Sequence, residues 1–539
     1  MKNSSIDQTI NKKSSPITSK KKNCTISQKF QYACGDKQFI KTFFKLFLPS
    51  AAQNFVIVLV MFLNNMYLAI FCGAEVKTSV ALADPINSFV LFVLIAWSGG
   101  VAVMMSQYYG GKEYQKNQQV LVFSFISASI LMLPFLIVLA VIPMQLMEMS
   151  SGLDQLTALT DATNLEYGAM YLRMVSWAFV PLIFNEFLST GLQSTEKPGI
   201  SLIGAIVATV ISATCAPIAI YFTKDNPMLS VVLVVSIDGI GRICQLIYLL
   251  AYVAAKKYEP IFIFKRVVVS KEVWTKTIRY GYPSFLNDFL FAIFSTVQTF
   301  SIFNYSKAVY NEHIVELAAN GKDFADIQNA ATNVTLLMQF ANVIWPGMAA
   351  ATAIQIGSYL GEGRIEEAKQ NSKRSLFWGF LISLTIVIFL FSVSWGVNDL
   401  LNMTEGNGDT VPAWMNRIAM YMEWAILPSI LSQGIFSINY YSMKSGGSKL
   451  IVFCDAGIML FWTALMAGLT FSGTLSHVHP ALYMFMIQVD QLIRMFATLF
   501  AMKYSNWAKN LTVEENPKSL KESFLEFKNR VLAKKSTKK

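Results

Sequence analysis

The sequence predicts an all-α polytopic membrane protein, with about twelve transmembrane helices in two six-helix, pseudo-symmetric lobes. Three observations support this fold class: an apolar composition, regularly spaced apolar runs, and a repetition of the first half of the chain in the second. Of the 539 residues, 54% are hydrophobic and only 14% are charged. Such a chain has too few polar residues for the surface of an ordinary soluble protein.

The apolar runs are each about 20 to 28 residues long, enough to cross a hydrocarbon core of about 30 Å as a helix. We expect the first six helices to form an N-lobe over 43–255 and the last six to form a C-lobe over 277–504. A cytoplasmic linker, 256–276, joins the lobes, and polar or basic tails occupy 1–42 and 505–539. The expected helices cover 43–71, 80–107, 118–143, 167–192, 199–223, 228–255, 277–305, 328–360, 374–397, 412–442, 449–471 and 479–504.

The net charge of +11 follows from membrane topology. Lysines and arginines gather in both tails and in the loops that follow every second helix. The opposite loops hold only Lys77, Lys224, Lys307 and Lys322. By the positive-inside rule, both termini of this multi-pass cell-membrane protein are cytoplasmic. No aromatic RNA-binding motif accompanies the basic residues, so we expect membrane lipids and small molecules as partners, and no nucleic acid.

Two apolar runs carry the same pair of buried charges. VSIDGIGRICQ (235–245) contains Asp238 and Arg242, and IQVDQLIRMFA (487–497) contains Asp490 and Arg494. The aspartates lie 490 − 238 = 252 positions apart. Each arginine follows its aspartate by four residues and so shares one helix face with it. We interpret each as a self-neutralising pair toward the outer half of the bilayer; a role in cavity polarity or outward gating is the alternative.

Further matches show that a whole six-helix unit is repeated. SQYYGGKEYQK (106–116) corresponds to SYLGEGRIEEAK (358–369), and WAFVP corresponds to WAILP, which aligns Pro181 with Pro428. Because six is an even number, the second unit enters the membrane from the same side as the first. The halves are therefore parallel repeats around an axis along the membrane normal. Pro181 and Pro428 are candidate hinges for alternating access, with inherited packing as the alternative.

Several segments together resemble one transporter family. They are LFLPSAAQNF (46–55), SGGVAVMMSQYYGGKEYQK (98–116), YGYPSFLNDFLF (280–291) and WPGMAAATAIQIGSYLGEGRIEEAK (345–369). Their order, spacing and duplication are similar to those of the multidrug and toxic compound extrusion (MATE) family. The resemblance implies a secondary active multidrug exporter, in which H+ or Na+ antiport drives cationic amphipathic compounds out by alternating access. The alternative is a lipid-linked oligosaccharide flippase of the same superfamily.

Neither an enzyme nor a cofactor is expected, apart from the coupling ion. The loops are short and carry no paired catalytic constellation. The six cysteines form no CxxC motif, and the three histidines lie outside the expected helices or at their ends, so no metal site is predicted. We expect the transporter to act as a monomer.

Four acids in apolar runs have no base nearby in the sequence and are the candidate ion-coupling residues: Asp288, Glu423, Glu186 and Asp455. Helical rise places the first three near mid-depth and Asp455 closer to the cytoplasm. A carboxylate there can exchange a proton or ligate a hard cation. The alternative for each is a salt bridge to an arginine of another helix, such as Arg173 or Arg417.

Three amides near the first helix are candidate substrate or cavity residues: Gln53, Asn64 and Asn65. By the resemblance, many relatives have an acid eight positions before a glycine, where this chain has Asn65 before Gly73. An amide does not titrate, so proton coupling through this helix is not expected. Amides that bridge neighbouring helices are the alternative interpretation.

Two segments outside the repeat have patterns of their own. The second half carries about 17 extra residues in 308–328, for which we expect a short amphipathic outer cap. In the basic tail, apolar residues recur at helical spacing at Leu520, Phe524, Phe527 and Val531. This predicts a basic amphipathic helix on the anionic inner leaflet.

Overall fold

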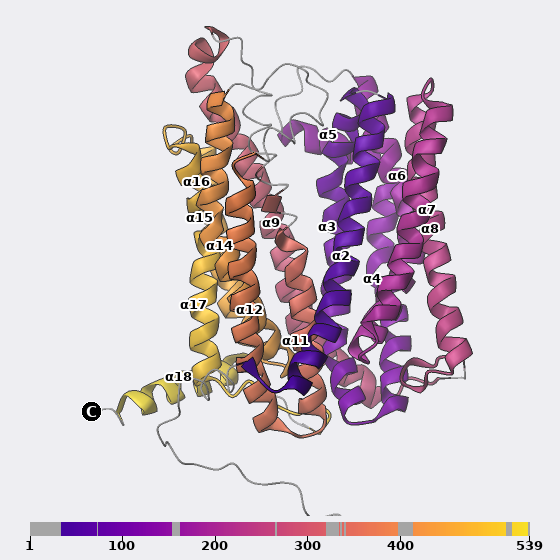
Figure 1. Cartoon of the computed structure of the whole chain (residues 1–539), viewed down its shortest axis with the longest axis vertical. Helices are drawn as coiled ribbons and strands as arrows, with labels where there is room; N and C mark the ends of the chain where they lie inside the picture. Colours follow the sequence, from indigo (N-terminus) through magenta and orange to yellow (C-terminus); the bar gives the residue numbers. More distant parts are fainter. Residues whose placement is uncertain are drawn as a thin grey trace, which may run out of the picture.

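The computed structural model describes residues 34–72, 74–153, 162–264, 267–319, 334, 337–338, 341–396, 413–513 and 520–536. These residues are almost entirely helical, and none of them lies in a β-strand. Figure 1 shows long, roughly parallel helices in two groups, with α2 to α8 in one and α9 to α17 in the other. The predicted fold class is confirmed.

The N-lobe contains six long helices, each over one of the expected apolar runs. Among the described residues there is also a short helix that the sequence did not predict, α5 (Pro143–Leu153). The long helices are α2 (Lys37–Cys72), α3 (Ala74–Gly110), α4 (Tyr114–Val141), α6 (Ala162–Ser194), α7 (Pro198–Thr223) and α8 (Pro227–Lys256).

The C-lobe contains the other six expected helices, two of them irregular. A π-helical turn, η3 (Phe453–Gly457), precedes α15 (Ile458–Phe471), and the last span is divided at Gln488 into α16 (Pro480–Ile487) and α17 (Val489–Tyr504). The remaining helices are α9 (Lys271–Ala319), α11 (Ile344–Gly361), α12 (Ile365–Val393) and α14 (Ala413–Ser445). Eight helices of the described chain are long and apolar enough to span a membrane by themselves; α2, α9, α11 and α14 are not among them.

The segments outside the repeat differ in outcome. Residues 308–319 continue α9, so this part of the extra segment forms no separate cap, and residues 320–328 lie outside the described residues. The linker contains a short 3-10 turn, η2 (Glu259–Ile261), to which Asn117 and Gln118 of α4 donate hydrogen bonds at the carbonyls of Pro260 (2.9 Å) and Glu259 (2.6 Å).

The predicted tail helix is present as α18 (Leu520–Ser536). It lies at the lower end of Figure 1, where α2 begins and α17 ends, and runs across the direction of the other helices. We call this end of the molecule the terminal face. By the charge asymmetry of the loops, the terminal face is the side expected in the cytoplasm.

The two lobes meet closely near the terminal face. Gly110 at the end of α3 packs on α11, where an added Cβ would lie 2.1 Å from the carbonyl oxygen of Ser358. A Cβ on Gly361 would lie 2.0 Å from the carbonyl oxygen of Gln107. Only glycine allows two backbones to approach this closely. Gly110 and Gly361 lie in the matching segments 106–116 and 358–369, so this part of the repeat belongs to the closed contact between the lobes.

The start of α2 strengthens the same closure. Its buried side chains Phe43, Leu46 and Phe47 belong to a core cluster of the C-lobe, although the helix itself belongs to the N-lobe. Just before α2, the carbonyl of Cys34 accepts a hydrogen bond of 3.0 Å from the indole of Trp378 in α12. The first helix thus crosses from one lobe to the other at the terminal face.

Candidate functional site

Asp288 of α9 forms an ion pair with a lysine from another helix. Lys444 Nζ of α14 lies 2.6 Å from Asp288 Oδ2, and the hydroxyl of Tyr440 donates a hydrogen bond to Oδ1. The side chain of Lys444 is 3% exposed and that of Asp288 is 24% exposed. No base stands near Asp288 in the sequence, so this partner was missed: Lys444 lies in the polar SMKSGGSK segment, at the very end of α14. An interhelical salt bridge was the alternative interpretation, with an arginine as the partner.

The neighbouring Asn287 connects this pair to a second acid. Its buried amide donates to the hydroxyl of Tyr440 (3.0 Å) and to Asp455 Oδ2 (2.7 Å), and accepts from the backbone N–H of Ala456 (3.2 Å). Asp455 lies in the π-helical turn η3. Such a turn displaces one residue from regular helical register and is frequent at functional sites, and here the displaced turn meets α9.

Arg494 of α17 joins two carboxylates. Nη1 lies 2.6 Å from Asp455 Oδ1, and Nη2 lies 3.0 Å from Asp490 Oδ2. The predicted pairing of Asp490 with Arg494 is therefore observed, but the arginine also serves Asp455. Asp455 lies in the turn η3, which precedes α15, so Arg494 connects α17 with the start of this neighbouring helix. The placement of the Asp490–Arg494 pair toward the outer half of the bilayer stays a prediction.

These contacts form one largely buried network, which we call the C-lobe charge network. It holds three carboxylates against two cations, giving 2 − 3 = −1 if all five groups are ionised. Buried charges are costly unless they are compensated, so the network favours one additional positive charge. Its members are Asp288, Lys444, Asp455, Arg494 and Asp490, connected by Asn287 and Tyr440.

The Asp288–Lys444 pair lies against the N-lobe. A Cβ on Gly99 of α3 would lie 2.9 Å from Lys444 Nζ and 3.4 Å from Asp288 Oδ2. Nearby, the rings of Trp97 and Phe285 meet edge to face, with 5.5 Å between their centroids. The pair is therefore placed to respond when the lobes move relative to each other.

In the N-lobe the related charges are arranged differently. Arg242 Nε lies 3.0 Å from Asp238 Oδ2, as the spacing predicted, but both side chains are half-buried. The amide of Asn185 in α6 donates to the backbone carbonyl of Arg242 (2.7 Å). Next to Asn185, Glu186 accepts a hydrogen bond of 2.7 Å from the hydroxyl of Ser98 in α3. Matching sequences thus occupy unequal environments in the two lobes.

Sequence reasoning also missed an N-lobe acid, Asp84. The hydroxyl of Tyr171 lies 3.4 Å from Asp84 Oδ1, and the amide of Asn87 donates to the same hydroxyl at 3.3 Å. Asp84 stands beside Pro85 at the start of an expected span, a position that is typical of a helix end. Its partner Tyr171 on α6 could not be read from the local pattern.

The remaining candidates do not gather at one place. Gln53 is buried and accepts a hydrogen bond of 3.0 Å from the amide of Gln193, so it bridges α2 and α6. Asn64 Oδ1 is buried without a hydrogen-bond partner among the described residues, whereas the side chain of Asn65 lies outside them. Glu423 is buried in α14.

The helices α6 and α14 continue through the candidate hinge residues Pro181 and Pro428. No group of three potential ligands that could hold a metal ion occurs among the described residues.

The chain after α17 closes the terminal face. We call residues 505–513 the clasp. Its side chains Trp507 and Ala508 are buried in a C-lobe core cluster, whereas Leu511 is buried in the N-lobe cluster. The clasp therefore spans both lobes across their line of contact.

Gln107 of α3 binds the clasp through both ends of its amide. Its Nε2 donates to the carbonyl oxygens of Ser445 (2.6 Å) and Lys509 (3.3 Å), and its Oε1 accepts from the backbone N–H of Leu511 (2.7 Å). Gln107 is buried. One N-lobe side chain thus makes three hydrogen bonds to the other side of the contact, using both its donor and its acceptor. These bonds must break if the lobes separate at this face.

Two further bonds hold the clasp. The amide of Asn510 donates to the carbonyl of Gly361 (3.1 Å), and Lys276 Nζ donates to the carbonyl of Thr512 (2.7 Å). Lys276 also contacts Glu272 at 3.1 Å, and this hydrogen bond, helped by the charge of Lys116, lowers the pKa of the Glu272 carboxyl. The terminal face is thus closed by backbone packing, one buried amide and several surface contacts.

Comparisons with known proteins identify relatives of this arrangement. The MatE family model matches residues 49–218. The crystal structure of a eukaryotic MATE transporter superposes with a TM-score of 0.70 at 12% identity, covering 88% of this chain and 98% of that one. An outward-facing multidrug resistance MATE transporter of the MOP superfamily gives 0.68 at 15% identity, covering 88% and 96%. A MOP superfamily transporter from Pyrococcus furiosus gives 0.65 at 14% identity, again covering 88% and 96%. No curated protein matches the chain.

Proposed function

We propose that this chain, which matches the MatE family model over 49–218 and has the fold of MATE transporter structures, is a MATE-type secondary active exporter of cationic amphipathic compounds. In this proposal a proton or sodium ion enters from the outer side and exchanges for the substrate. One observation supports the coupling above all others: the C-lobe charge network has three carboxylates and only two cations. The coupling ion supplies the missing positive charge.

Asp288 is the member of the network at which the exchange takes place. It is the most exposed of the three carboxylates, at 24% against 6% for Asp455 and 1% for Asp490. An incoming cation competes with Lys444 for its oxygen atoms. Displacement of the ammonium group, which faces Gly99 of α3, changes the charge presented to the N-lobe. Ion binding and the contact between the lobes are thereby linked.

Because the terminal face is closed, we assign these contacts to the outward-open state of the transporter. Gln107 and the clasp hold the lobes together on the side expected in the cytoplasm. Release of substrate to the outside occurs from this state, and loading from the cytoplasm requires the clasp contacts to break. A ligand that changes this equilibrium must bind the two states with different affinities, which the coupling ion does through Asp288.

The experiment uses the full chain in proteoliposomes with a fluorescent cationic dye. An imposed proton or sodium gradient should drive dye movement against its own gradient, and the ion that does so is the coupling ion. A parallel assay follows a lipid-linked oligosaccharide between leaflets. Lipid translocation without gradient-driven dye export would replace the exporter by the flippase alternative.

A further inference from the structure

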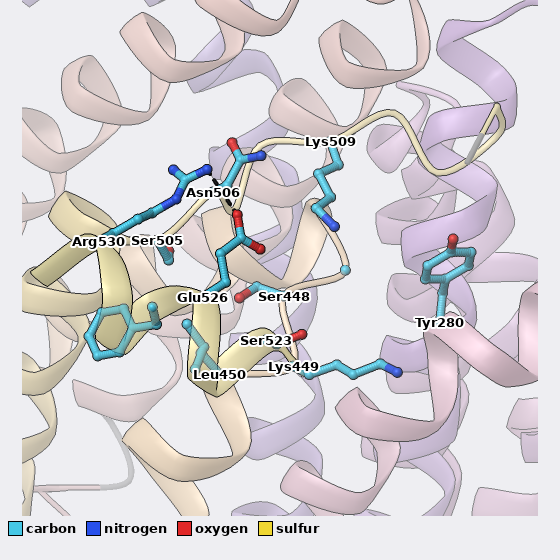
Figure 2. A pocket seen from close by; sticks show the side chains of 12 residues that line it. Tyr280, Ser448, Lys449, Leu450, Ser505, Asn506, Lys509, Ser523, Glu526 and Arg530 are labelled. Carbon is cyan, nitrogen blue, oxygen red and sulfur yellow. Dashed lines mark hydrogen bonds and ion pairs between the residues drawn. The ribbon is translucent and has the colours of Figure 1, made fainter. Parts of the chain in front are cut away.

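A pocket lies beside the clasp at the terminal face, apart from the C-lobe charge network. Three parts of the chain form it: the loop after α14, the start of the clasp, and α18 (Figure 2). Tyr280 of α9 closes one side. The lining side chains that carry its chemistry are Lys449, Lys509, Arg530, Glu526, Ser448, Ser505, Ser523 and Asn506.

The pocket is chemically suited to an anion. Its lining carries three cationic side chains against one acid, Glu526, whose carboxylate lies 2.9 Å from Arg530 Nη2. In Figure 2 the ammonium groups of Lys449 and Lys509 lie between α18 and Tyr280. Ser505 Oγ is buried without a hydrogen-bond partner among the described residues. Ammonium groups and hydroxyl donors around one space are the groups that bind a phosphate oxygen.

The position of α18 indicates where the phosphate comes from. This helix carries five basic and two acidic residues, 5 − 2 = +3. Its Phe524, Leu525 and Leu532 are exposed, while Phe527 packs on Phe500 of α17 with 5.8 Å between ring centroids. A basic helix with exposed apolar side chains next to the end of a membrane span lies in the lipid interface. The pocket therefore opens at the level of the headgroups.

We propose that this pocket binds the phosphate group of an anionic phospholipid headgroup of the inner leaflet. Lys449 and Lys509 hold the phosphate by charge, and the serine hydroxyls of the loop, the clasp and α18 donate to its oxygen atoms. Because Lys509 and Ser505 belong to the clasp and Lys449 to the C-lobe, a bound headgroup ties the clasp to the C-lobe. The lipid thereby stabilises the closed terminal face, a role independent of the transported compound.

The test uses the full chain in detergent, titrated with short-chain phosphatidylinositol 4-phosphate, and follows the rise in unfolding temperature that accompanies binding. The variant Lys449→Gln with Lys509→Gln should weaken binding about tenfold or more, because it removes both ammonium groups that are proposed to contact the phosphate directly. The control is Lys521→Gln with Lys528→Gln, which removes the same charge from exposed positions of α18 outside the pocket. It should bind nearly as the unchanged protein does.

A second measurement tests whether the bound lipid holds the clasp to the C-lobe. Amide hydrogen exchange over 505–513 should slow when the lipid is added to the unchanged protein, and should not respond in the Lys449→Gln, Lys509→Gln variant. Equal loss of binding in both double variants would mean that the lipid is attracted to the basic surface in general, and would overturn the assignment of the binding site to the pocket. Equal protection by soluble inositol phosphate or inorganic phosphate would overturn the assignment to a lipid. Failure of the lipid to stabilise the unchanged protein would overturn the proposal outright.

Discussion

Lys444 Nζ lies 2.6 Å from Asp288 Oδ2, so this candidate ion-coupling acid has a cationic partner from another helix. The pair changes what Asp288 is expected to do. A lone carboxylate simply gains or loses a cation, whereas in the proposed mechanism this one exchanges Lys444 for another cation. Movement of the lysine is then part of the coupling step.

The first prediction concerns Asp288→Asn. The amide keeps the size of the side chain and much of its hydrogen bonding but cannot hold a proton or attract a cation by charge. Export of a cationic dye driven by an imposed gradient should be lost in proteoliposomes, while dye binding to the purified protein persists. If gradient-driven export continues at the rate of the unchanged protein, Asp288 is structural. Glu423, Glu186 and Asp455 are then the next acids to test, in that order.

The second prediction separates stability from coupling. Asp288→Asn leaves the buried Lys444 ammonium without its carboxylate, and loss of one partner of a buried pair costs about 3–5 kcal/mol. Addition of Lys444→Met removes that charge, so the double variant should recover most of this loss in the free energy of unfolding. It should still fail in gradient-driven export. Recovery of export by the double variant would show that only the balance of charge matters, not Asp288 itself.

The sequence was sufficient for features that depend on local pattern. Apolar runs of membrane length predicted the helices, because a buried backbone must satisfy its own hydrogen bonds. The spacing of four residues predicted that Asp238 would meet Arg242 and that Asp490 would meet Arg494. The duplicated glycines and their neighbours marked the repeat that forms the contact between the lobes.

The same local patterns could not predict which side chains meet between helices. Lys444 reaches Asp288, and Arg494 reaches Asp455, across helix pairs whose rotation the sequence pattern does not fix. The π-helical turn at Asp455 shifts the helix register without any proline or glycine signal at that residue. The clasp was assigned to the basic tail, 505–539, since Trp507 and Leu511 have no periodic neighbours that would indicate burial.

The third prediction concerns Gln107→Ala. The change removes the amide that serves Ser445, Lys509 and Leu511, and unpaired buried backbone groups cost about 1–3 kcal/mol each. The equilibrium should shift away from the closed terminal face, measured as increased labelling of an introduced cysteine at Ser106 by a cytoplasmic reagent. Gln118→Ala is the control, because Gln118 of α4 donates a hydrogen bond of 2.6 Å to the carbonyl of Glu259 in the linker, and this bond does not connect the two lobes. Equal labelling in both variants would contradict the role of Gln107.

The fourth prediction concerns Gly361→Ala. The added Cβ would meet the carbonyl oxygen of Gln107 at 2.0 Å, and a backbone atom cannot yield as a flexible side chain does. The closed contact should be disfavoured and export slowed, with the protein still inserted and folded, because the clash exists only when the lobes meet. Gly199→Ala is the matched control, since nothing lies within 4 Å of its added Cβ. A distance measured between labels on α3 and α11 should increase for Gly361→Ala alone.

The last prediction compares two truncations of the tail. A chain that ends after Asn516 loses α18 but keeps the clasp, and it should retain most of its export, because the clasp still connects Gln107 with the C-lobe. A chain that ends after Tyr504 also loses Trp507, Ala508 and Leu511 from the two cores. It should expose the cytoplasmic side to labelling and export slowly, even when the amount inserted in the membrane is matched. The two truncations differ by only twelve residues beyond Tyr504, so a general effect of losing the basic tail would affect both. If export falls to the same low level after either truncation, closure depends on α18 rather than on the clasp.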